Sequence, residues 1–413
     1  MKRLLFQAGV DMGNTAQVEN IVKGWQFSQA AKRQKSSIIR EILKDSSKPG
    51  IVNFGGGLPA PDLFPLEKIK QSCINVIQNN GTNALQYSLT AGVSLLQEQI
   101  VKRYNAQGVD VSIDDIQITG GSQQGLDVIA RIFIEPGAVV LTETPTYLGA
   151  LQAFSFFSAK YVSIETDSDG IIPEDLENKI IKHKPRFIYL VATFQNPTGI
   201  TLTKKRREQV VEVARKYNCP IVDDNPYGEI RFAGKEVPSL KSIGKELVIE
   251  LGTFSKLISP GLRIAWIASN PQLRLIIERM KQAIDLHTNT FCQYVVADFI
   301  AAGHLDTHIE IIKKEYGKRR NFMIDMLKKY FSDKVSWTTP EGGLFLWIKL
   351  PDNISATDML PKAIEAGVAY VPGKFFYSEK QDDSTMRLNF CNATEENIEL
   401  GIKRLADVVA SVS

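Results

Sequence analysis

Cysteine is scarce in this sequence, with four residues among 413. They stand far apart, at Cys73, Cys219, Cys292 and Cys391, and no two form a C-x-x-C pair. This spacing argues against a disulfide framework and a zinc ribbon, and it is typical of proteins from a reducing compartment.

Histidine is equally scarce, with four residues, and gives no metal signature. His304 and His308 are spaced i, i+4, but the glutamate of an H-E-x-x-H motif is missing. We therefore predict surface positions for this pair and no bound metal.

Long apolar runs and an excess of one charge are also lacking. The apolar run at residues 4–6 is too short for the core of a signal peptide, and no run approaches the ~18 apolar residues of a membrane span. Lys plus Arg is 49 against 46 for Asp plus Glu, so the net charge of +3 leaves no electrostatic footprint for nucleic acid. We expect a soluble, cytoplasmic protein that binds neither membranes nor nucleic acid.

Short apolar runs alternate with helical patterns from residue 65 to about residue 290. The strand candidates are residues 116–119, 139–142, 187–192, 221–223, 247–251 and 263–268. This alternation predicts an α/β fold with a mainly parallel sheet between helices. Because ligands of such sheets bind beyond the carboxyl ends of the strands, the residues that follow each strand are the candidates for function.

The flanking regions differ in character. A helix is predicted around residues 38–43, and the polar residues before it are expected to form an arm. The stretch at 51–65, IVNFGGGLPAPDLFP, predicts irregular backbone that approaches a ligand closely, or a plain connector. We predict three parts: 1–60, an arm with part of a small domain; 61–295, a large domain; and 296–413, a small α+β domain.

One stretch, GTFSKLISPGLRIAW, combines a lysine with hydroxyls and an arginine. A partly desolvated lysine near positive charge is a good Schiff-base former, as Lys256 would be. Thr253, Ser255 and Arg263 are suited to a phosphate group. A solvated surface turn is the alternative.

Two further strand ends carry candidate ligand-binding groups. GGSQQG opens a helix, whose free amides together with Ser122 and Gln123 would bind phosphate, although a plain helix start has the same pattern. In TPTYLGA, Tyr147 could stack on a planar ring or pack in the core.

Three polar residues lie on or after apolar strands nearer the C-terminus. Asn196 in FQNPTG can donate to a phenolate oxygen. Asp224 in DDNPY needs a cationic partner if it is buried, such as a pyridinium nitrogen, and Tyr227 follows it; a solvated turn acid is the alternative. Arg387 in MRLNF suits a substrate carboxylate or a structural salt bridge.

Taken in chain order, these groups describe a pyridoxal 5'-phosphate (PLP) site. From about residue 35 to its end, the chain resembles the fold-type I aminotransferases of class I and II. It is most similar to the 2-aminoadipate and kynurenine aminotransferases. The strings that carry the resemblance are FGGGLPAPDLFP, LQYSLTAG, ITGGSQQGLD, FQNPTG, DDNPY, GTFSKLISPGLR and AIDLHT.

The resemblance implies a role for each matching residue. Lys256 would hold PLP as a Schiff base and move the substrate proton, while Asp224 would keep the pyridine nitrogen protonated. Asn196 and Tyr227 would bind the phenolic oxygen, and Tyr147 would stack on the ring. The phosphate would be bound by Ser122, Gln123, Thr253, Ser255 and Arg263.

The resemblance also implies substrate and subunit contacts. Arg387 would bind the α-carboxylate of the substrate with help from Asn196 and the region of Gly57. Arg33 matches an arginine that meets a distal substrate carboxylate, although plain solvent exposure is the alternative. Tyr87 matches a tyrosine that reaches the phosphate of a neighbouring subunit, which implies a homodimer with shared active sites.

The implied reaction moves the amino group of a 2-aminoadipate, aromatic or branched-chain L-amino acid to 2-oxoglutarate by a ping-pong cycle. A C–S lyase or another PLP enzyme of this fold is the first alternative. A regulator with a winged-helix DNA-binding domain and a non-catalytic relative are less favoured. The first would need a longer N-terminal extension, and the second would lack some of these chemical groups.

Overall fold

The computed structural model describes residues 24–33 and 50–412 and divides the chain into two units, residues 1–35 and 36–413. In the smaller unit, helix α2 (Gln29–Arg33) begins after Ser28, whose Oγ accepts the N–H of Ala31 at 3.1 Å. The arm before residue 24 and the predicted helix at 38–43 lie outside the described residues. Within the described ranges, no helix has both the length and the apolar character needed to cross a membrane.

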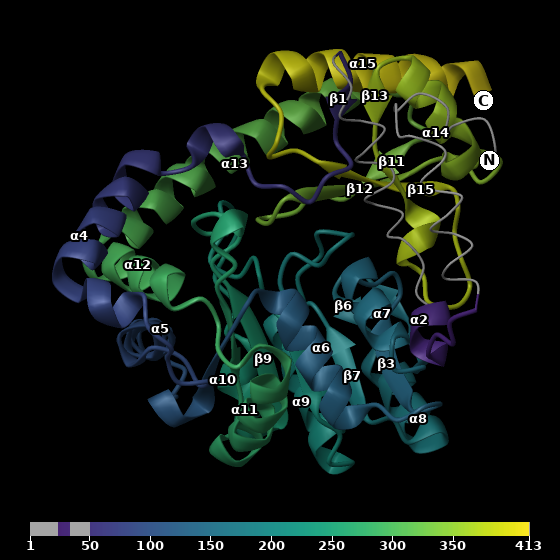
Figure 1. Ribbon diagram of the computed structural model, residues 1–413. Coiled ribbons are helices and arrows are strands. Elements are labelled where there is room, and N and C mark those ends of the chain that lie inside the picture. Colours follow the sequence, from purple (N-terminus) through teal and green to yellow (C-terminus); the bar gives the residue numbers. More distant parts are fainter. Residues whose placement is uncertain (1–23, 34–49, 413) are drawn as a thin grey trace. The chain divides into compact units, whose positions relative to one another are not determined.

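The larger unit contains a seven-stranded sheet with the order β2-β10-β9-β8-β7-β3-β4 (Figure 1). Its strands are β2 (Ile116–Thr119), β3 (Val139–Glu143), β4 (Lys160–Ile164), β7 (Phe187–Leu190), β8 (Ile221–Asp224), β9 (Val248–Thr253) and β10 (Ala265–Ala268). Only β10 runs antiparallel to its neighbours, while the pairs from β4 to β9 are parallel. The predicted α/β fold with a mainly parallel sheet is confirmed.

Helices cover both faces of this sheet, because successive strand residues face opposite sides. Phe187 packs with α6 and α7, whereas its neighbour Ile188 packs with α8 and α9. The helices of this part of the chain are α4 (Leu66–Ala84), α5 (Ser94–Ala106), α6 (Ser122–Phe133), α7 (Leu148–Ser155), α8 (Pro173–His183), α9 (Lys204–Lys216), α10 (Leu240–Gly244), α11 (Pro271–Asp285) and α12 (Thr290–Ala301). Burial on both faces explains why the strands read as continuous apolar runs.

All six predicted strands are present, with ends shifted by at most two residues. The sequence analysis missed β4, which lies at the edge of the sheet. This strand begins with the exposed Lys160, and only Ile164 is fully buried, so it lacks the apolar run that marks the inner strands. A small hairpin of β5 (Thr166–Asp167) and β6 (Gly170–Ile171) follows it.

A second, antiparallel sheet has the order β11-β12-β15-β14. Its strands are β11 (Ser336–Trp337), β12 (Phe345–Lys349), β15 (Thr385–Asn389) and β14 (Val371–Pro372), accompanied by the helices α13 (His304–Tyr330), α14 (Ala356–Glu365) and α15 (Glu395–Val412). The prediction of wholly irregular backbone at 51–65 is wrong, because β1 (Val52–Asn53) pairs with β13 (Val368–Ala369) and a 3-10 turn spans Pro61–Leu63. The domain boundaries at 60 and 295 stay predictions.

The predicted surface position of His308 is also wrong. His308 is 6% exposed, because the buried face of α13 includes Leu305, Ile309 and Ile312 at helical spacing and places residue 308 among them. Across residues 24–33 and 50–412, no group of three or more His, Cys, Asp or Glu side chains could hold a metal ion.

Candidate active site

The carboxyl ends of three parallel strands bring most of the predicted site residues together. Asp224 is the last residue of β8 and Thr253 the last of β9, while Asn196 follows β7. Because β7, β8 and β9 are neighbours in the sheet, these ends meet at one edge.

Asp224 is buried, and only one of its two carboxyl oxygens has a hydrogen-bond partner among the described residues. Its Oδ2 accepts a hydrogen bond from the Tyr189 hydroxyl at 3.0 Å, whereas Oδ1 has no partner among the described residues. Burial raises the pKa of Asp224 to about 6, against the hydrogen bond from Tyr189 and the charge of Lys256. A buried carboxyl with an unpaired oxygen suits a protonated ring nitrogen.

Lys256 lies close to Gly57, whose carbonyl oxygen accepts a hydrogen bond from Nζ at 2.6 Å. Burial lowers the pKa of Lys256 to about 8, and the positive charge of Arg387 acts in the same direction. A lowered pKa increases the fraction of neutral amine, which is the form that attacks a carbonyl carbon.

Hydroxyls, an arginine and the start of α6 form a group whose chemistry suits an anion. The Oγ of Ser122, the first residue of α6, is buried without a partner among the described residues, and Thr253 Oγ1 donates to Ser255 Oγ at 3.0 Å. Arg263 Nη2 donates to the carbonyl of Gly120 at 3.1 Å. The free amides and dipole of the helix start favour a phosphate here.

Glycine is required just before this helix. Gly121 has φ +98°, and a Cβ on it would lie 2.1 Å from Arg263 Nη2. Gln123 points elsewhere, because its Nε2 donates to the carbonyl of Gly149 at 3.1 Å, beside the start of α7.

Two tyrosines flank Asp224. Burial raises the pKa of Tyr147 to about 12, and the charge of Asp224 adds to this rise. Burial also raises the pKa of Tyr227, while the neighbouring Asn196 side chain opposes the rise. The ring of Tyr227 meets Phe345 edge-on, with 6.1 Å between the centroids. Both phenols therefore stay protonated near neutral pH and can donate hydrogen bonds.

Arg387 lies on β15 and is only 1% exposed. Its Nη1 donates to Asn196 Oδ1 at 2.8 Å and its Nη2 to the Gly55 carbonyl at 2.7 Å, while Nε is unpaired among the described residues. The guanidinium carbon lies 4.1 Å from the ring centroid of Phe345 and 5.0 Å from that of Phe376. Carbonyl oxygens and aromatic rings thus hold this cation, and burial lowers its pKa to about 10.

Two further predicted residues are exposed. Tyr87 is 79% exposed, and its ring meets that of His287 edge-on, with 5.8 Å between the two centroids. Arg33 is an exposed residue of α2 in the smaller unit.

The sequence analysis missed the residues that position the site. Tyr189 orients Asp224, and its signal was a hydroxyl inside the apolar run FIYLVAT. Asn389 donates from Nδ2 to the carbonyls of Gly56 and Leu58 and so holds the glycine stretch in place. No sequence pattern marked the aromatic rings that flank Arg387.

These residues fit PLP on three counts. The spare oxygen of Asp224 suits its ring nitrogen, the unpartnered Ser122 hydroxyl and Arg263 suit its phosphate, and the Lys256 amine suits its aldehyde.

Comparison with known proteins agrees with this arrangement. The model of the family "Aminotransferase class I and II" matches residues 49–405. An aromatic-amino-acid aminotransferase from Thermococcus litoralis is 43% identical over 393 residues, or 93% of this chain and 94% of the relative. A 2-aminoadipate transaminase from Thermus thermophilus is 34% identical over 383 residues, or 92% of this chain and 95% of the relative.

Among solved structures, a Pyrococcus horikoshii kynurenine aminotransferase in complex with PMP is similar with a TM-score of 0.91 and 40% identity. The match covers 96% of this chain and 99% of that one. The chain therefore belongs to the class I and II aminotransferases, and it is a PLP-dependent amino-acid aminotransferase of fold type I.

Proposed function

We propose that this enzyme moves the amino group of a 2-aminoadipate, aromatic or branched-chain L-amino acid to 2-oxoglutarate by a ping-pong cycle. The names of the relatives support the donor class. The observation that carries the proposal is Arg387, a buried arginine held by carbonyls and rings beside Lys256, which suits an amino-acid carboxylate.

Each of these residues has a separate role, which follows from its position in the site. When bound, PLP supplies an electron-withdrawing ring that stabilises negative charge at the substrate Cα. Asp224 would keep a proton on the ring nitrogen, and Lys256, as a weakened base, would carry the proton between the substrate Cα and the C4' position of the cofactor. Arg387 orients the substrate through its carboxylate.

The remaining predicted residues bind and orient the cofactor. Tyr227 and Asn196 act on the phenolic oxygen, and Tyr147 stacks on the ring. Ser122, Gln123, Thr253, Ser255 and Arg263 bind the phosphate. Gln123 would do so after leaving the Gly149 carbonyl that it contacts here.

Titration of the holoenzyme with single L-amino acids tests the proposed half-reaction. We expect the absorbance of the cofactor to change to that of its amino form with the preferred donors and to recover when 2-oxoglutarate is added. Release of pyruvate and ammonia without this change would instead indicate a C–S lyase.

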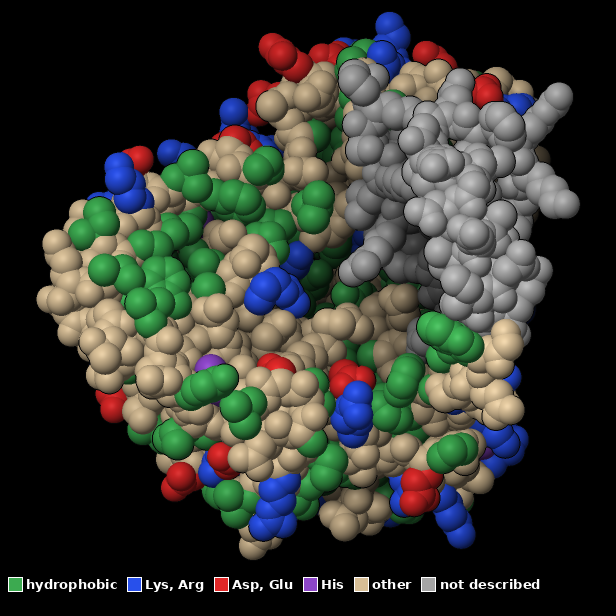
Figure 2. Space-filling view, viewed as in Figure 1, with side chains coloured by type: hydrophobic (Ala, Val, Ile, Leu, Met, Phe, Trp, Pro, Cys, Tyr) green, Lys and Arg blue, Asp and Glu red, His purple; other side chains and the backbone are tan. Residues whose placement is uncertain are grey.

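We further propose a homodimer. Exposed apolar side chains gather over α4 and the loop after it, and Figure 2 shows hydrophobic side chains over the α4 region. They include Leu66, Ile74, Ile77, Leu85 and Leu89. Tyr87 belongs to the same loop, so pairing of two copies there could bring it to the phosphate of the partner's site. The cytoplasmic location stays a prediction based on the four free cysteines.

Hybrid dimers test the shared site. Lys256→Ala and Tyr87→Ala subunits should each be nearly inactive alone. A mixed dimer would contain one site with both native residues, so we expect the isolated mixed dimer to have about half of the activity of the native dimer and an equal random mixture to have about a quarter. Mixing without any gain would contradict the contribution of Tyr87 across subunits.

Arg33 remains a proposed contact for the distal carboxylate of an aminoadipate-type donor. Arg33→Gln should raise KM for 2-aminoadipate and leave KM for phenylalanine unchanged. An equal change for both donors would contradict this role.

A further inference from the structure

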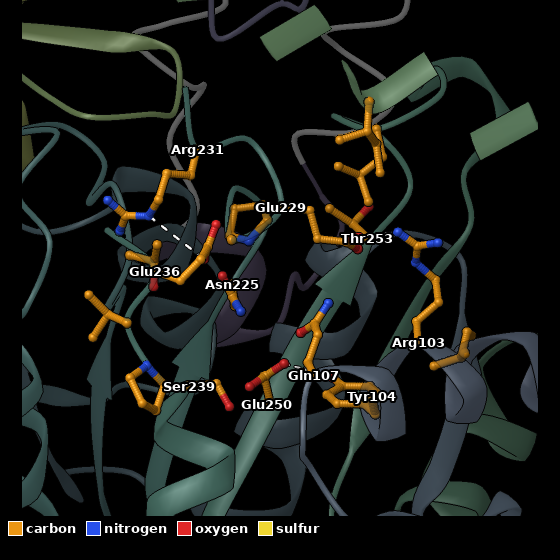
Figure 3. A pocket seen from close by; sticks show the side chains of 18 of the residues that line it. Arg103, Tyr104, Gln107, Asn225, Glu229, Arg231, Glu236, Ser239, Glu250 and Thr253 are labelled. Carbon is orange, nitrogen blue, oxygen red and sulfur yellow. Dashed lines mark hydrogen bonds and ion pairs between the residues drawn. The ribbon is translucent and has the colours of Figure 1, made fainter. Parts of the chain in front are cut away.

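A second cavity lies beside the active site, on the side of β9 that faces α5 and α13 (Figure 3). It has a volume of about 600 Å³, and its lining includes Tyr104, Asn225, Glu250 and Trp266. None of Lys256, Asp224 and Arg387 lines it, and Thr253 is the one predicted cofactor residue that does. We call it the Glu250 cavity.

Glu250 carries the only carboxyl group of this lining that is fully buried, at 4% exposure. Its Oε1 accepts a hydrogen bond from the Tyr104 hydroxyl at 2.7 Å, and Tyr104 in turn accepts from Trp266 Nε1 at 3.0 Å. Its Oε2 has no hydrogen-bond partner among the described residues. One oxygen of this buried carboxyl therefore keeps its capacity to accept a hydrogen bond.

The nearby cations do not neutralise this carboxyl directly. Arg207 donates to the carbonyls of Leu202 and Ala192 at 3.0 and 2.9 Å. Lys241 donates to the carbonyls of Lys245 and Val248 at 3.1 and 2.9 Å. Their hydrogen bonds thus go to backbone oxygens and, for Arg207, also to Thr193 Oγ1 at 2.8 Å, and neither makes an ion pair with Glu250.

The arginines nearer the mouth are already paired. Arg103 bonds to Glu229 and to Asp306, the latter at 2.7 Å. Arg231 bonds to Glu341 at 2.5 Å. These pairs leave little attraction for an anion inside the cavity.

A second acceptor lies beside Glu250. Asn225 Oδ1 is buried and, like Glu250 Oε2, has no partner within the described part of the chain. Figure 3 shows both side chains within the same cavity. The Asn225 side chain acts as a hydrogen-bond donor to the Glu250 carboxyl. The two oxygens that stay unpaired favour a ligand with N–H groups, and a buried carboxylate favours one with positive charge.

We propose that the Glu250 cavity binds a small organic cation whose guanidinium or ammonium group donates to Glu250 Oε2 and Asn225 Oδ1. The apolar part of the ligand would lie against Ile100, Leu257 and the indole of Trp266, which line the same space. Trp266 could also attract the cation through its ring.

The ionisation of Glu250 supports a measurable signature. The groups that act on it are the charged Asp223 on β8, Lys241 on α10 and Arg207 on α9, together with hydrogen bonds from Tyr104 on α5 and from Asn225, which lower its pKa. Burial raises the pKa of Glu250 to about 7, and the negative charge of Asp223 adds to the rise. A bound cation stabilises the carboxylate, so binding at pH 6.5 should release a proton and should tighten as the pH rises to 8.

Calorimetric titration of the holoenzyme with propylguanidinium tests the proposal. This probe does not form a Schiff base, and bound PLP already occupies Asp224 and Lys256. We expect saturable binding of one probe per subunit, with a heat that varies with the ionisation enthalpy of the buffer. The neutral isostere propylurea should bind at least tenfold more weakly.

Two variants and one control locate the site. Glu250→Gln keeps an acceptor for Tyr104 but removes the charge, so affinity should fall at least tenfold. Asn225→Leu should reduce it at least threefold and serves if Glu250→Gln does not fold. Glu310→Gln, which changes a 71% exposed carboxyl on the same lining that is paired with Lys313, should leave affinity within twofold. The proposal is overturned if the native protein does not bind the probe. It is also overturned if Glu250→Gln and Asn225→Leu both bind the probe as tightly as the native protein does.

Discussion

Arg387 and Asn196 are 191 residues apart in the chain, yet Arg387 Nη1 donates to Asn196 Oδ1 at 2.8 Å. The bond joins β15 of the antiparallel sheet to the segment after β7 of the seven-stranded sheet. The proposed carboxylate-binding group is thereby oriented by a residue that also serves the proposed cofactor site.

Arg387→Lys should weaken substrate binding more than cofactor binding. A lysine cannot reproduce two guanidinium hydrogen bonds, and loss of a charge-assisted bond costs about 1.5–3 kcal/mol. We expect KM for the amino acid to rise at least tenfold, with little change in the affinity for PLP. Arg131→Lys, which alters a surface pair with Asp127, is the control and should leave KM unchanged. A rise in KM below twofold would contradict the role of Arg387.

Asp224→Asn should reduce kcat strongly. The amide cannot keep the ring nitrogen protonated, and breaking a buried charge pair costs about 3–5 kcal/mol, or roughly 10²–10³-fold or more in rate. Asp223→Asn is a matched control on the same strand. Asp223 Oδ1 accepts the N–H of Ala192 at 3.2 Å, outside the proposed site, so its kcat should change only a few-fold. Steady-state rates that fall equally in both variants would indicate a structural role for Asp224.

Gly121→Ala should weaken the binding of PLP. The positive φ disfavours a side chain, and the new methyl group would displace the Arg263 guanidinium from its place beside the phosphate site. Such strain costs about 1–3 kcal/mol, so we expect a roughly 10- to 100-fold higher Kd in fluorescence titrations of the apoenzyme. In Gly120→Ala the nearest contact of the methyl group would be 3.4 Å, and the Kd should stay close to that of the native protein. Equal Kd values for the two variants would contradict the argument.

The native protein should lose folding stability as the pH rises, and Glu143→Gln should make this loss smaller. Burial raises the pKa of Glu143 to about 8, although its Oε2 accepts the N–H of Val191 at 2.9 Å. An acid with a raised pKa in the folded state holds its proton more tightly there, so the free energy of unfolding falls between pH 4.5 and 8. Thermal melts at pH 5 and 8 should show a smaller drop in Tm for Glu143→Gln than for the native protein. The exposed Glu212→Gln is the control, and curves that match it would refute the assignment.

The sequence predicts the inner strands and the residues at their ends because both depend on local patterns. Val139 to Leu141 reads as an apolar run, and Asp224 and Thr253 follow from where such runs stop. Edge strand β4 was not predicted, because its half-exposed residues form no apolar run. The burial of His308 was missed, although Leu305, Ile309 and Ile312 mark the same face of its helix. The Glu250 cavity was not predicted either, because its lining combines residues of α5 and α13, which are about 200 residues apart in the chain. The partner contact of Tyr87 stays a prediction.

Trp266 gives the molecule a built-in optical reporter. Its indole lines the Glu250 cavity and is joined to Glu250 through the Tyr104 hydroxyl, so the charge on that carboxyl acts on an emitting ring. Trp337 and Trp347 belong to the other sheet, and Trp25 lies exposed in the smaller unit. Emission that responds to cations in the cavity can therefore be assigned to one chromophore and followed without any label.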